Sequence, residues 1–253
     1  MGSEFEGPRT AIVTGGGRRI GAALCRALGA DGWHLLIHCN RSREAAQALA
    51  DELGNARVVA AELAAPEAAA TIMAALDGLP PPRLLVNNAS LFSYDSADAF
   101  TVEQWDRHLD VNLRAPALLS QAFVQAAPGG VIVNLLDAKL EAPNPDFFTY
   151  TVSKAGLAAL TELTARAWAG RGIRVCAIAP SVTLVSGPQS RENFDSVHAL
   201  NALRRGVRVE EIVAALRFIL ATPTFTGQTI TLDGGQRFLG LSRDVQFLET
   251  EDE

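Results

Sequence analysis

Short, uninterrupted apolar runs alternate with longer helical stretches along almost the whole chain. The first run, TAIVT at residues 10–14, is followed by a glycine turn and a helical stretch, and this order recurs down the sequence. Runs that are apolar at every position are typical of strands buried on both faces, as in a parallel sheet covered by helices. The alternation therefore predicts one doubly wound, Rossmann-type α/β domain with a parallel sheet of about seven strands.

Local signals place the boundaries of these elements. Pro66 stands where a first-turn proline would open a helix, and Thr101 with Gln104 has the spacing of a capping box, which marks a helix start. The predicted strands cover residues 10–14, 34–39, 57–63, 84–87, 131–136, 173–179 and 229–232. The predicted helices cover residues 20–30, 43–53, 66–76, 101–127, 148–169 and 209–221.

No linker, internal repeat or composition break divides residues 9–240, which we expect to form a single domain. Residues 1–8 begin MGSEFEG, lack the basic-then-apolar order of a secretory signal and are interpreted as a leader left by cloning. Residues 241–253 have the sequence LSRDVQFLETEDE and are expected to form a loosely held acidic tail.

Composition excludes several classes of function. The chain has 22 Lys and Arg against 28 Asp and Glu, a net charge of −6, which argues against a nucleic-acid partner. No apolar run approaches the roughly 20 residues that a membrane span requires. The three cysteines include no CxxC pair and the four histidines have no metal-ligand spacing. We therefore expect a soluble, cytoplasmic protein without a metal site.

The segment TGGGRRIG at residues 14–21 follows the first predicted strand directly. Glycines at such a turn let the backbone approach a pyrophosphate held at the N-terminus of the next helix. A glycine cluster alone would also fit a plain turn between a strand and a helix. Its place after the first strand of a doubly wound pattern favours a dinucleotide site.

The end of the second predicted strand indicates which dinucleotide is bound. An NAD site typically has an acidic residue there for the ribose 2′-hydroxyl. Here the segment is HCNRS at 38–42, without an acid, and Arg41 and Ser42 offer a cation and a hydroxyl to a 2′-phosphate. Arg18 approaches from the glycine turn, so the sequence favours NADP(H) as cofactor.

Tyr150 and Lys154 lie four residues apart at the start of a predicted helix, so their side chains share one face. A neighbouring ammonium favours the phenolate of a tyrosine. The pair therefore suits proton transfer to a reacting heteroatom while a hydride arrives from a nicotinamide. In another fold the same spacing would fit an ordinary surface pair.

Six motifs together resemble the short-chain dehydrogenase/reductase family over nearly the whole chain. They are TGGGRRIG (14–21), NNAS (87–90), VNLRAP (111–116), YTVSK (150–154), IAP (178–180) and LDGG (232–235). The resemblance implies that Tyr150 is the proton donor or acceptor, that Lys154 lowers its pKa and holds the nicotinamide ribose, and that Asn112 supports a water relay. It also implies a homotetramer.

The same resemblance implies a cofactor site built from several strand ends. Glu62 stands where the family usually has Asp near the adenine, and the longer acid can accept the same hydrogen bond. The residues expected to bind the cofactor are Gly15, Arg18, Arg19, Ile20, Gly21, Asn40, Arg41, Ser42, Glu62, Leu63, Asn88, Ala89, Ser90, Tyr150, Lys154, Pro180, Ser181 and Val182.

Three departures from the usual family pattern narrow the resemblance. Arg19 and Ser90 stand where glycines are usual, and Asp137 replaces the usual serine thirteen residues before Tyr150. These departures resemble the pteridine reductase branch, including bacterial dihydromonapterin and dihydrofolate reductases. That branch implies that Phe92 stacks on the pterin and that Arg19 reaches the cofactor phosphates and the pterin. The residues expected to bind substrate are Arg19, Ser90, Phe92, Asp137 and Tyr150.

The chemistry of Asp137 supports the same interpretation. An anionic side chain there would repel the alkoxide that develops on a ketone, but it can hydrogen-bond Tyr150 and raise its pKa so that the phenol stays protonated. The expected catalytic residues are therefore Tyr150, Lys154, Asp137 and Asn112.

The sequence hypothesis is an NADPH-dependent reductase of a dihydropterin or dihydrofolate. A hydride would pass to a C=N bond of the pterin ring, and the proton would come from Tyr150 or from a water held near Arg19. One alternative is an NADPH-dependent carbonyl reductase of 3-oxoacyl thioesters or small ketones. Another is a catalytically silent NADP(H)-binding sensor. The polar segment 181–205, expected to be irregular, would form the substrate loop and decide which substrate is bound.

Overall fold

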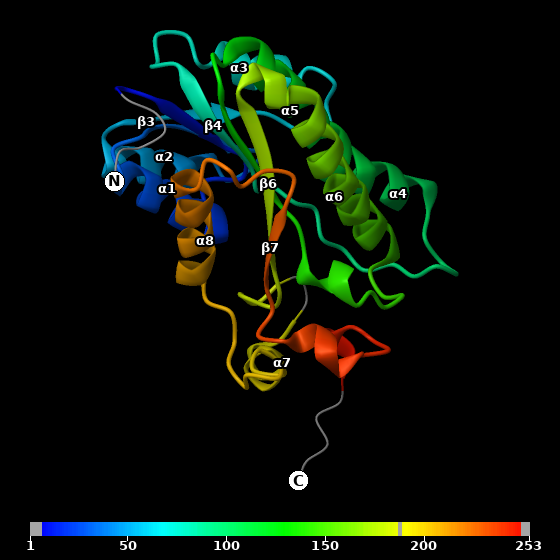
Figure 1. Ribbon diagram of the computed structural model, residues 1–253. Helices are drawn as coiled ribbons and strands as arrows, with labels where there is room; N and C mark the ends of the chain where they lie inside the picture. Colours follow the sequence, from blue (N-terminus) through cyan, green and yellow to red (C-terminus); the bar gives the residue numbers. More distant parts are fainter. Residues whose placement is uncertain (1–6, 187–188, 249–253) are drawn as a thin grey trace.

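Seven strands form one parallel sheet, which confirms the predicted Rossmann-type fold (Figure 1). The computed structural model describes residues 7–186 and 189–248, and the strand order within them is β3-β2-β1-β4-β5-β6-β7. The strands are β1 (Thr10–Val13), β2 (His34–Cys39), β3 (Ala56–Ala60), β4 (Pro82–Asn87), β5 (Gly130–Leu135), β6 (Ile173–Pro180) and β7 (Thr229–Leu232). The order reverses direction between β1 and β4, where this class of fold opens a crevice for its ligand.

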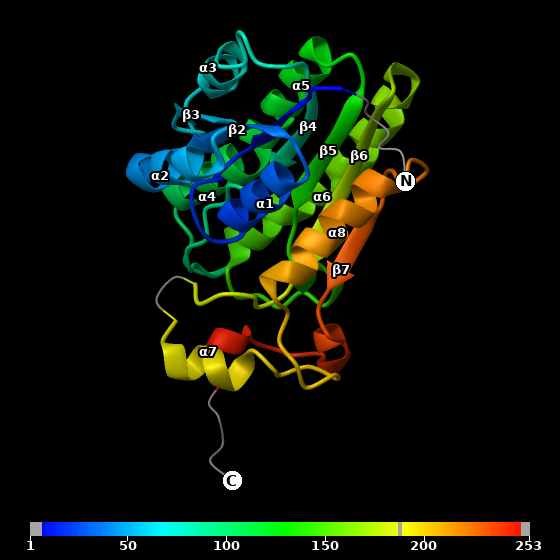
Figure 2. The same ribbon diagram turned by 90° about the vertical axis from the view of Figure 1, so that its left-hand side faces the viewer.

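Alternate residues of the central strands face two separate cores. In β1, Ala11 and Val13 face one core, Ile12 faces the other, and all three are fully buried. This explains why the strand runs are apolar at every position. The first core is covered by α1 (Arg19–Ala30), α2 (Arg43–Leu53) and α8 (Val209–Ala221), as Figure 2 shows. The second is covered by α3 (Ala68–Ala74), α5 (Ala115–Ala126) and α6 (Phe148–Trp168), with α4 (Val102–Leu109) packed on α6.

The helix predicted over 101–127 contains a wide turn in its middle. Its predicted capping box is present, since Thr101 Oγ1 accepts from Gln104 N at 3.2 Å and Gln104 Oε1 accepts from Thr101 N at 2.9 Å. A π-helical turn (Asp110–Arg114) then joins α4 to α5. Such turns are common at functional sites, and this one carries Asn112.

The third strand is shorter than predicted. It was expected to reach Leu63 but ends at Ala60, because the following residues turn away from the sheet. Ala65 N donates to Glu62 O at 2.9 Å in that turn. Helix α3 consequently begins at Ala68, two residues later than predicted.

A small layer lies beyond the carboxyl ends of the strands. It consists of α7 (Arg191–Val197) and the C-terminal segment 241–248, which lie together at the bottom of Figures 1 and 2. Residues 181–205 were expected to be irregular throughout, and α7 corrects that expectation. The helix forms there because Ser190 caps it: Ser190 Oγ accepts from Asn193 N at 3.1 Å.

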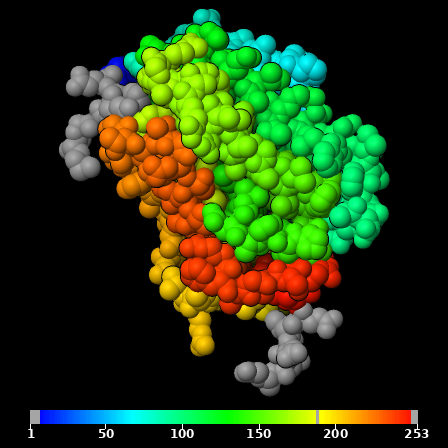
Figure 3. Space-filling view, turned by 45° about the vertical axis from the view of Figure 1, so that its right-hand side comes forward, coloured from blue at the N-terminus to red at the C-terminus, as the bar shows by residue number. Residues whose placement is uncertain are grey.

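The C-terminal tail is not loosely held along residues 241–248, contrary to the expectation. Val245 is only 7% exposed. The Asp146 carboxylate accepts from Arg243 Nε at 2.7 Å and from Asp244 N at 2.8 Å. These bonds hold the segment against the underside of the domain (Figure 3). The rest of the predicted tail, 249–253, and residues 1–6 of the predicted leader lie outside the described residues.

Candidate active site

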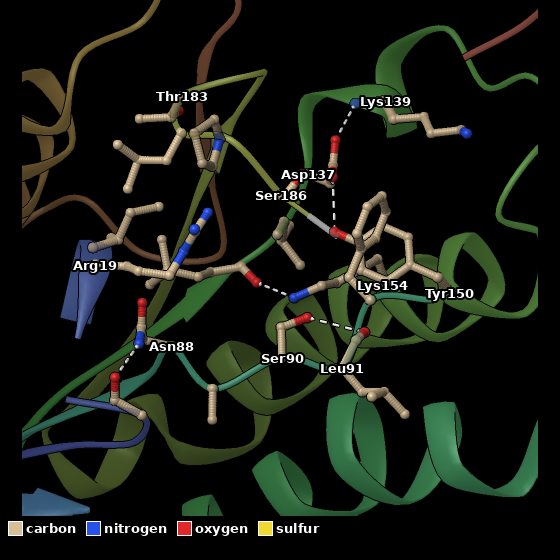
Figure 4. A pocket seen from close by; sticks show the side chains of 18 of the residues that line it. Arg19, Asn88, Ser90, Leu91, Asp137, Lys139, Tyr150, Lys154, Thr183 and Ser186 are labelled. Atoms are coloured by element: carbon tan, nitrogen blue, oxygen red, sulfur yellow. Dashed lines mark hydrogen bonds between the residues drawn. The ribbon is translucent and has the colours of Figure 1, made fainter. Parts of the chain in front are cut away.

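A pocket of about 1000 Å³ opens at the carboxyl ends of the strands. Its walls include residues that follow β1 to β7, the start of α6, the loop before α7 and the C-terminal segment. All the residues predicted to bind cofactor or substrate line it, and so do three of the four predicted catalytic residues. The exception is Asn112. Figure 4 shows the central part of this pocket.

The glycine turn after β1 fits closely against the start of α1. A Cβ atom at Gly21 would lie 2.2 Å from the carbonyl oxygen of Gly15, so only glycine fits there. Asn88 ties the turn to the end of β4, because its Nδ2 donates to Thr14 O at 2.8 Å and to Gly15 O at 3.2 Å. The backbone of α1 thus begins directly at the pocket.

His38 joins the loops of this end of the pocket, a role that the sequence analysis missed. Gly15 N donates to His38 Nδ1 at 3.2 Å, so Nδ1 is unprotonated and His38 Nε2 carries the hydrogen donated to Ala61 O at 3.0 Å. Burial lowers the pKa of His38, which favours this neutral form. A lone histidine within an apolar strand gives no sequence signal for such a role.

Two cations and an amide mark the far end of the pocket. Arg18 and Arg41 both line it, and neither guanidinium group makes a hydrogen bond or ion pair with another described residue. Beside them, Asn40 Nδ2 donates to Glu62 Oε2 at 2.6 Å. The exposed guanidinium groups of the two arginines can therefore bind an anion.

Tyr150, Asp137 and Lys154 meet at the centre of the pocket (Figure 4). Tyr150 Oη donates to Asp137 Oδ2 at 2.7 Å, which is the hydrogen bond that the sequence predicted. The other carboxylate oxygen of Asp137 accepts from Lys139 N at 2.8 Å. Lys154 Nζ donates to Leu135 O at 2.7 Å and lies 5.8 Å from the centre of the Tyr150 ring.

The electrostatics of this group keep the phenol protonated. Burial, and after it the charge and hydrogen bond of Asp137, raise the pKa of Tyr150 well above its ordinary value of 10.0. Burial also lowers the pKa of Lys154 to about 8. These effects outweigh the lowering of the Tyr150 pKa that was expected from Lys154, and the phenol stays protonated.

Titration of Tyr150 provides a test that needs no substrate. The sequence contains two tyrosines, so Tyr94→Phe leaves Tyr150 alone to contribute phenolate absorbance in the ultraviolet. We expect no ionisation of Tyr150 until well above pH 10, and an earlier one after Asp137→Asn removes the neighbouring charge. Circular dichroism at each pH shows that the protein is still folded. An ordinary Tyr150 pKa that Asp137→Asn does not change would contradict these electrostatics.

Asn112 lies behind the pocket wall, and both polar atoms of its side chain are hydrogen-bonded to neighbouring groups. Its Nδ2 donates to Leu91 O at 2.9 Å and to Ser153 Oγ at 3.0 Å. Its Oδ1 accepts from Leu91 N at 2.8 Å and from Ser90 Oγ at 3.3 Å. Asn112 thus fastens the loop after β4 to helix α6, while the water relay implied by the resemblance stays a prediction.

An aromatic wall lies beside Tyr150. The ring of Phe92 stacks on Phe147, with centroids 4.2 Å apart, and makes an edge contact with the Tyr150 ring at a centroid distance of 4.8 Å.

Arg19 approaches from the glycine turn at a positive φ of 54°, and its Nη1 donates to Val185 O at 2.6 Å. Arg19 therefore holds the loop before α7 against the pocket.

The C-terminal segment adds an acidic side chain that the sequence analysis missed. Asp244 lines the pocket and its Oδ2 accepts from Lys139 Nζ at 3.2 Å, while the same ammonium donates to Asp146 O at 2.6 Å. The negative charge of Asp244 also contributes to the raised pKa of Tyr150. An acidic stretch near a chain end carries no sequence signal for a place in a pocket.

Residues 7–186 and 189–248 contain neither a candidate metal site nor a candidate membrane span. No group of three or more His, Cys, Asp or Glu side chains is arranged to hold a metal ion in this part of the chain. No helix there combines the length and the apolar character needed to cross a membrane.

Residues 9–195 match the protein family described as short chain dehydrogenase. The chain belongs to the short-chain dehydrogenase/reductase family. One relative within it is 3beta-hydroxysteroid dehydrogenase 1 of Eggerthella lenta, 32% identical over 90% of this chain and 93% of its own. Another is a 3-oxoacyl-[acyl-carrier-protein] reductase of Synechocystis, 30% identical over 90% of this chain and 96% of its own.

A solved structure is more similar in sequence than these two relatives. It is FolM alternative dihydrofolate reductase 1 from Brucella canis, complexed with NADP, which is 40% identical to this chain. The alignment covers 90% of this chain and 94% of that one, with a TM-score of 0.87. This short-chain dehydrogenase/reductase thus resembles the dihydrofolate reductase branch that the sequence analysis named.

Proposed function

We propose that the protein is an NADPH-dependent reductase of a dihydropterin or dihydrofolate. The observation that carries the proposal is the hydrogen bond of 2.7 Å from Tyr150 to Asp137, an acid where the family usually has a serine. A carboxylate there disfavours a developing alkoxide and favours a substrate that presents N–H donors. The similarity to the Brucella canis dihydrofolate reductase supports the same choice.

The residues around the glycine turn fit NADP(H). The turn offers backbone N–H groups at the start of α1, which suit a pyrophosphate. Arg18, Arg41 and Ser42 supply two cations and a hydroxyl for a 2′-phosphate, and no acid takes the place that an NAD site would need. The NADP bound to the Brucella canis structure agrees with this assignment. When bound, the cofactor supplies the hydride.

Arg41→Ala is expected to weaken NADPH binding about tenfold or more, because a charge-assisted hydrogen bond is lost. NADH lacks the 2′-phosphate and should bind more weakly than NADPH. Its affinity for the variant and for the unmodified protein should therefore agree within about twofold. Arg43→Ala is the matched control, since Arg43 is exposed nearby on α2 but does not line the pocket. Fluorescence titration of the reduced nicotinamides measures both. Equal losses for NADH and NADPH would contradict the assignment of Arg41.

Tyr150 is the proton donor in the proposed reaction. The hydride adds to the carbon of a C=N bond in the pterin ring, and the electron pair of that bond moves to the nitrogen, which takes the proton from Tyr150 Oη. The ammonium of Lys154 then stabilises the phenolate until water returns a proton. The ring would gain the hydride that the bound cofactor would supply and the proton from Tyr150, so the step balances.

Asp137 and Phe92 hold the substrate in this account. Asp137 accepts hydrogen bonds from Tyr150 Oη and from the Lys139 N–H, and a carboxylate has further lone pairs for the N–H groups of a pterin. Phe92, stacked on Phe147, provides a flat apolar wall for an aromatic ring. A pterin combines both features.

A carbonyl reductase is the second candidate, and the 3-oxoacyl-[acyl-carrier-protein] reductase of Synechocystis is the relative that favours it. In both reactions Tyr150 would donate the proton, so the substrate distinguishes them. Loss of reduced-nicotinamide absorbance should be followed in parallel with dihydromonapterin, dihydrobiopterin, dihydrofolate and an acetoacetyl thioester. Turnover on a pterin or folate supports the proposal, whereas turnover on the thioester alone supports the carbonyl reductase. Silence on all four, with cofactor still bound, supports the sensor.

We propose that the protein assembles as a homotetramer, as the family resemblance implies, and that it is cytoplasmic, as its composition indicates. Light scattering of the purified protein measures the assembly directly.

A further inference from the structure

A buried polar cluster lies directly behind Tyr150. It consists of the buried side chains of Asp95, His108 and Thr149, with the hydroxyl of Ser93 at its edge. None of the four lines the pocket. No motif of the sequence analysis includes them, and the proposed chemistry does not use them.

Asp95 caps the helix that carries Tyr150. Helix α6 begins at Phe148, after Phe147 at a φ of 53°, and Phe147 provides no side-chain cap. Asp95 replaces that cap: its carbonyl oxygen accepts from Phe148 N at 3.4 Å and its Oδ1 accepts from Thr149 N at 3.0 Å. Its Oδ2 accepts the hydrogen of the Thr149 hydroxyl. The first turn of α6 is thus fixed by a residue from the loop after β4.

The proton positions in the cluster follow from its contacts. The Thr149 hydroxyl donates its one hydrogen to Asp95, so His108 Nδ1, 2.6 Å from Thr149 Oγ1, must be the donor in that contact. The same Nδ1–H faces Gln104 O at 3.1 Å. His108 Nε2 then accepts from Ser93 Oγ at 3.2 Å. Burial lowers the pKa of His108, in agreement with this neutral form.

The cluster connects the two features that the reaction needs. Thr149 immediately precedes Tyr150, and the His108 ring meets the Tyr150 ring at a centroid distance of 6.3 Å. Ser93 immediately follows Phe92, whose ring also contacts the Tyr150 ring, at a centroid distance of 4.8 Å. One buried network therefore joins the segments that carry Tyr150 and Phe92. These segments are helix α6, helix α4 and the loop after β4.

We propose that Asp95 and Thr149 are positioning residues of the reaction, acting through the placement of the Tyr150 phenol against Asp137. The inference rests on the proposed role of Tyr150 as proton donor, whichever substrate receives the proton. A shift of the first turn of α6 would move the phenol without touching the cofactor end of the pocket. Misplacement by about 1 Å can cost a large factor in rate.

Thr149→Val tests this inference, because valine keeps the shape of the side chain and removes the hydroxyl. We expect kcat to fall about tenfold or more, with KM for NADPH unchanged within about twofold. Thr149→Ser, which restores the hydroxyl, should recover most of the activity. The matched control is Thr161→Val on the same helix: Thr161 is equally buried, donates to Leu157 O at 2.8 Å and accepts from Asn134 Nδ2 at 2.9 Å. It should lower Tm without lowering kcat.

Two further measurements test whether Asp95 and Thr149 position Tyr150. Asp95→Asn keeps an acceptor for Thr149 N but offers an amide group to the hydroxyl, so it should lower kcat as Thr149→Val does. In the Tyr94→Phe background, Thr149→Val should also shift the Tyr150 titration to lower pH, because the phenol moves away from Asp137.

The measurements distinguish failure of this inference from failure of the proposed function. If Thr149→Val lowers Tm as Thr161→Val does but leaves kcat and the Tyr150 titration unchanged, the inference is wrong and the cluster only stabilises the fold. If the unmodified protein reduces none of the four substrates, the proposed function is wrong, while the titration still decides whether Thr149 positions Tyr150.

Discussion

Tyr150→Phe is expected to lower kcat about 10³-fold, because it removes the one group that the account places to protonate the substrate. The phenylalanine ring keeps the edge contact with Phe92, so the pocket keeps its shape. NADPH binding should change by no more than about twofold, since the hydroxyl bonds to Asp137 and not to the residues of the glycine turn. Steady-state kinetics and a fluorescence titration measure the two quantities.

The chain's other tyrosine provides the control for this variant. Tyr94 packs its ring against Phe147 and Phe247 but does not line the pocket. Tyr94→Phe should therefore keep kcat within a few-fold of the unmodified protein. Retained turnover in Tyr150→Phe would show that another group donates the proton.

Asp137→Ser is expected to lower dihydropterin reduction about 10- to 100-fold, the cost of losing a hydrogen bond to a charged group. It also removes the charge that helps to keep Tyr150 protonated. Reduction of an acetoacetyl thioester should rise, because a serine gives the carbonyl oxygen a neutral donor where an anion stood. The measurement is kcat/KM on both substrates.

Asp137→Asn distinguishes the effect of losing the carboxylate charge from the effect of the hydroxyl that Asp137→Ser introduces. It keeps the shape of the side chain but not its charge, and it should lose pterin reduction without the gain on the thioester. If Asp137→Ser and Asp137→Asn both leave dihydropterin reduction at its original rate, Asp137 does not select the substrate, and the main argument for a pterin is lost.

The sheet was predictable because its strands are buried on both faces. In β1 and β2 the residues 11–13 and 35–37 face one core or the other, so the middle of each run is apolar without alternation and shows in the sequence. The strand at 57–63 was predicted too long for a related reason: Leu63 is apolar and buried, but it lies in the turn that follows the strand. Composition alone does not separate a buried turn from a strand.

The centre of the site was predictable from local spacing and from the family resemblance. Tyr150 and Lys154 are one helical turn apart, and the glycine turn follows the first strand. Asp137 was recognised because it occupies the position, thirteen residues before Tyr150, where the family usually has a serine. The geometry then added the hydrogen bond that joins Asp137 to Tyr150.

The supporting residues could not be predicted, because each acts through partners far away in the chain. His38 bonds to Gly15 and Ala61, and Asp95 bonds to Thr149 across 54 residues of sequence. Asp244 reaches Lys139 across 105 residues. Single polar residues of this kind have no periodic pattern, and their contacts exist only once the sheet has brought the loops together.

Transfer of deuterium from the nicotinamide to the pterin tests the central claim most directly. NADPH deuterated at the transferred position of its nicotinamide ring is incubated with the protein and a 7,8-dihydropterin, and the product is analysed by mass spectrometry and NMR. We expect one deuterium on the ring carbon of the former C=N bond, and the same labelled product formed about 10³-fold more slowly by the Tyr150→Phe protein. Oxidation of the cofactor with no deuterium in the pterin, or transfer to the acetoacetyl thioester alone, would contradict a pterin reductase.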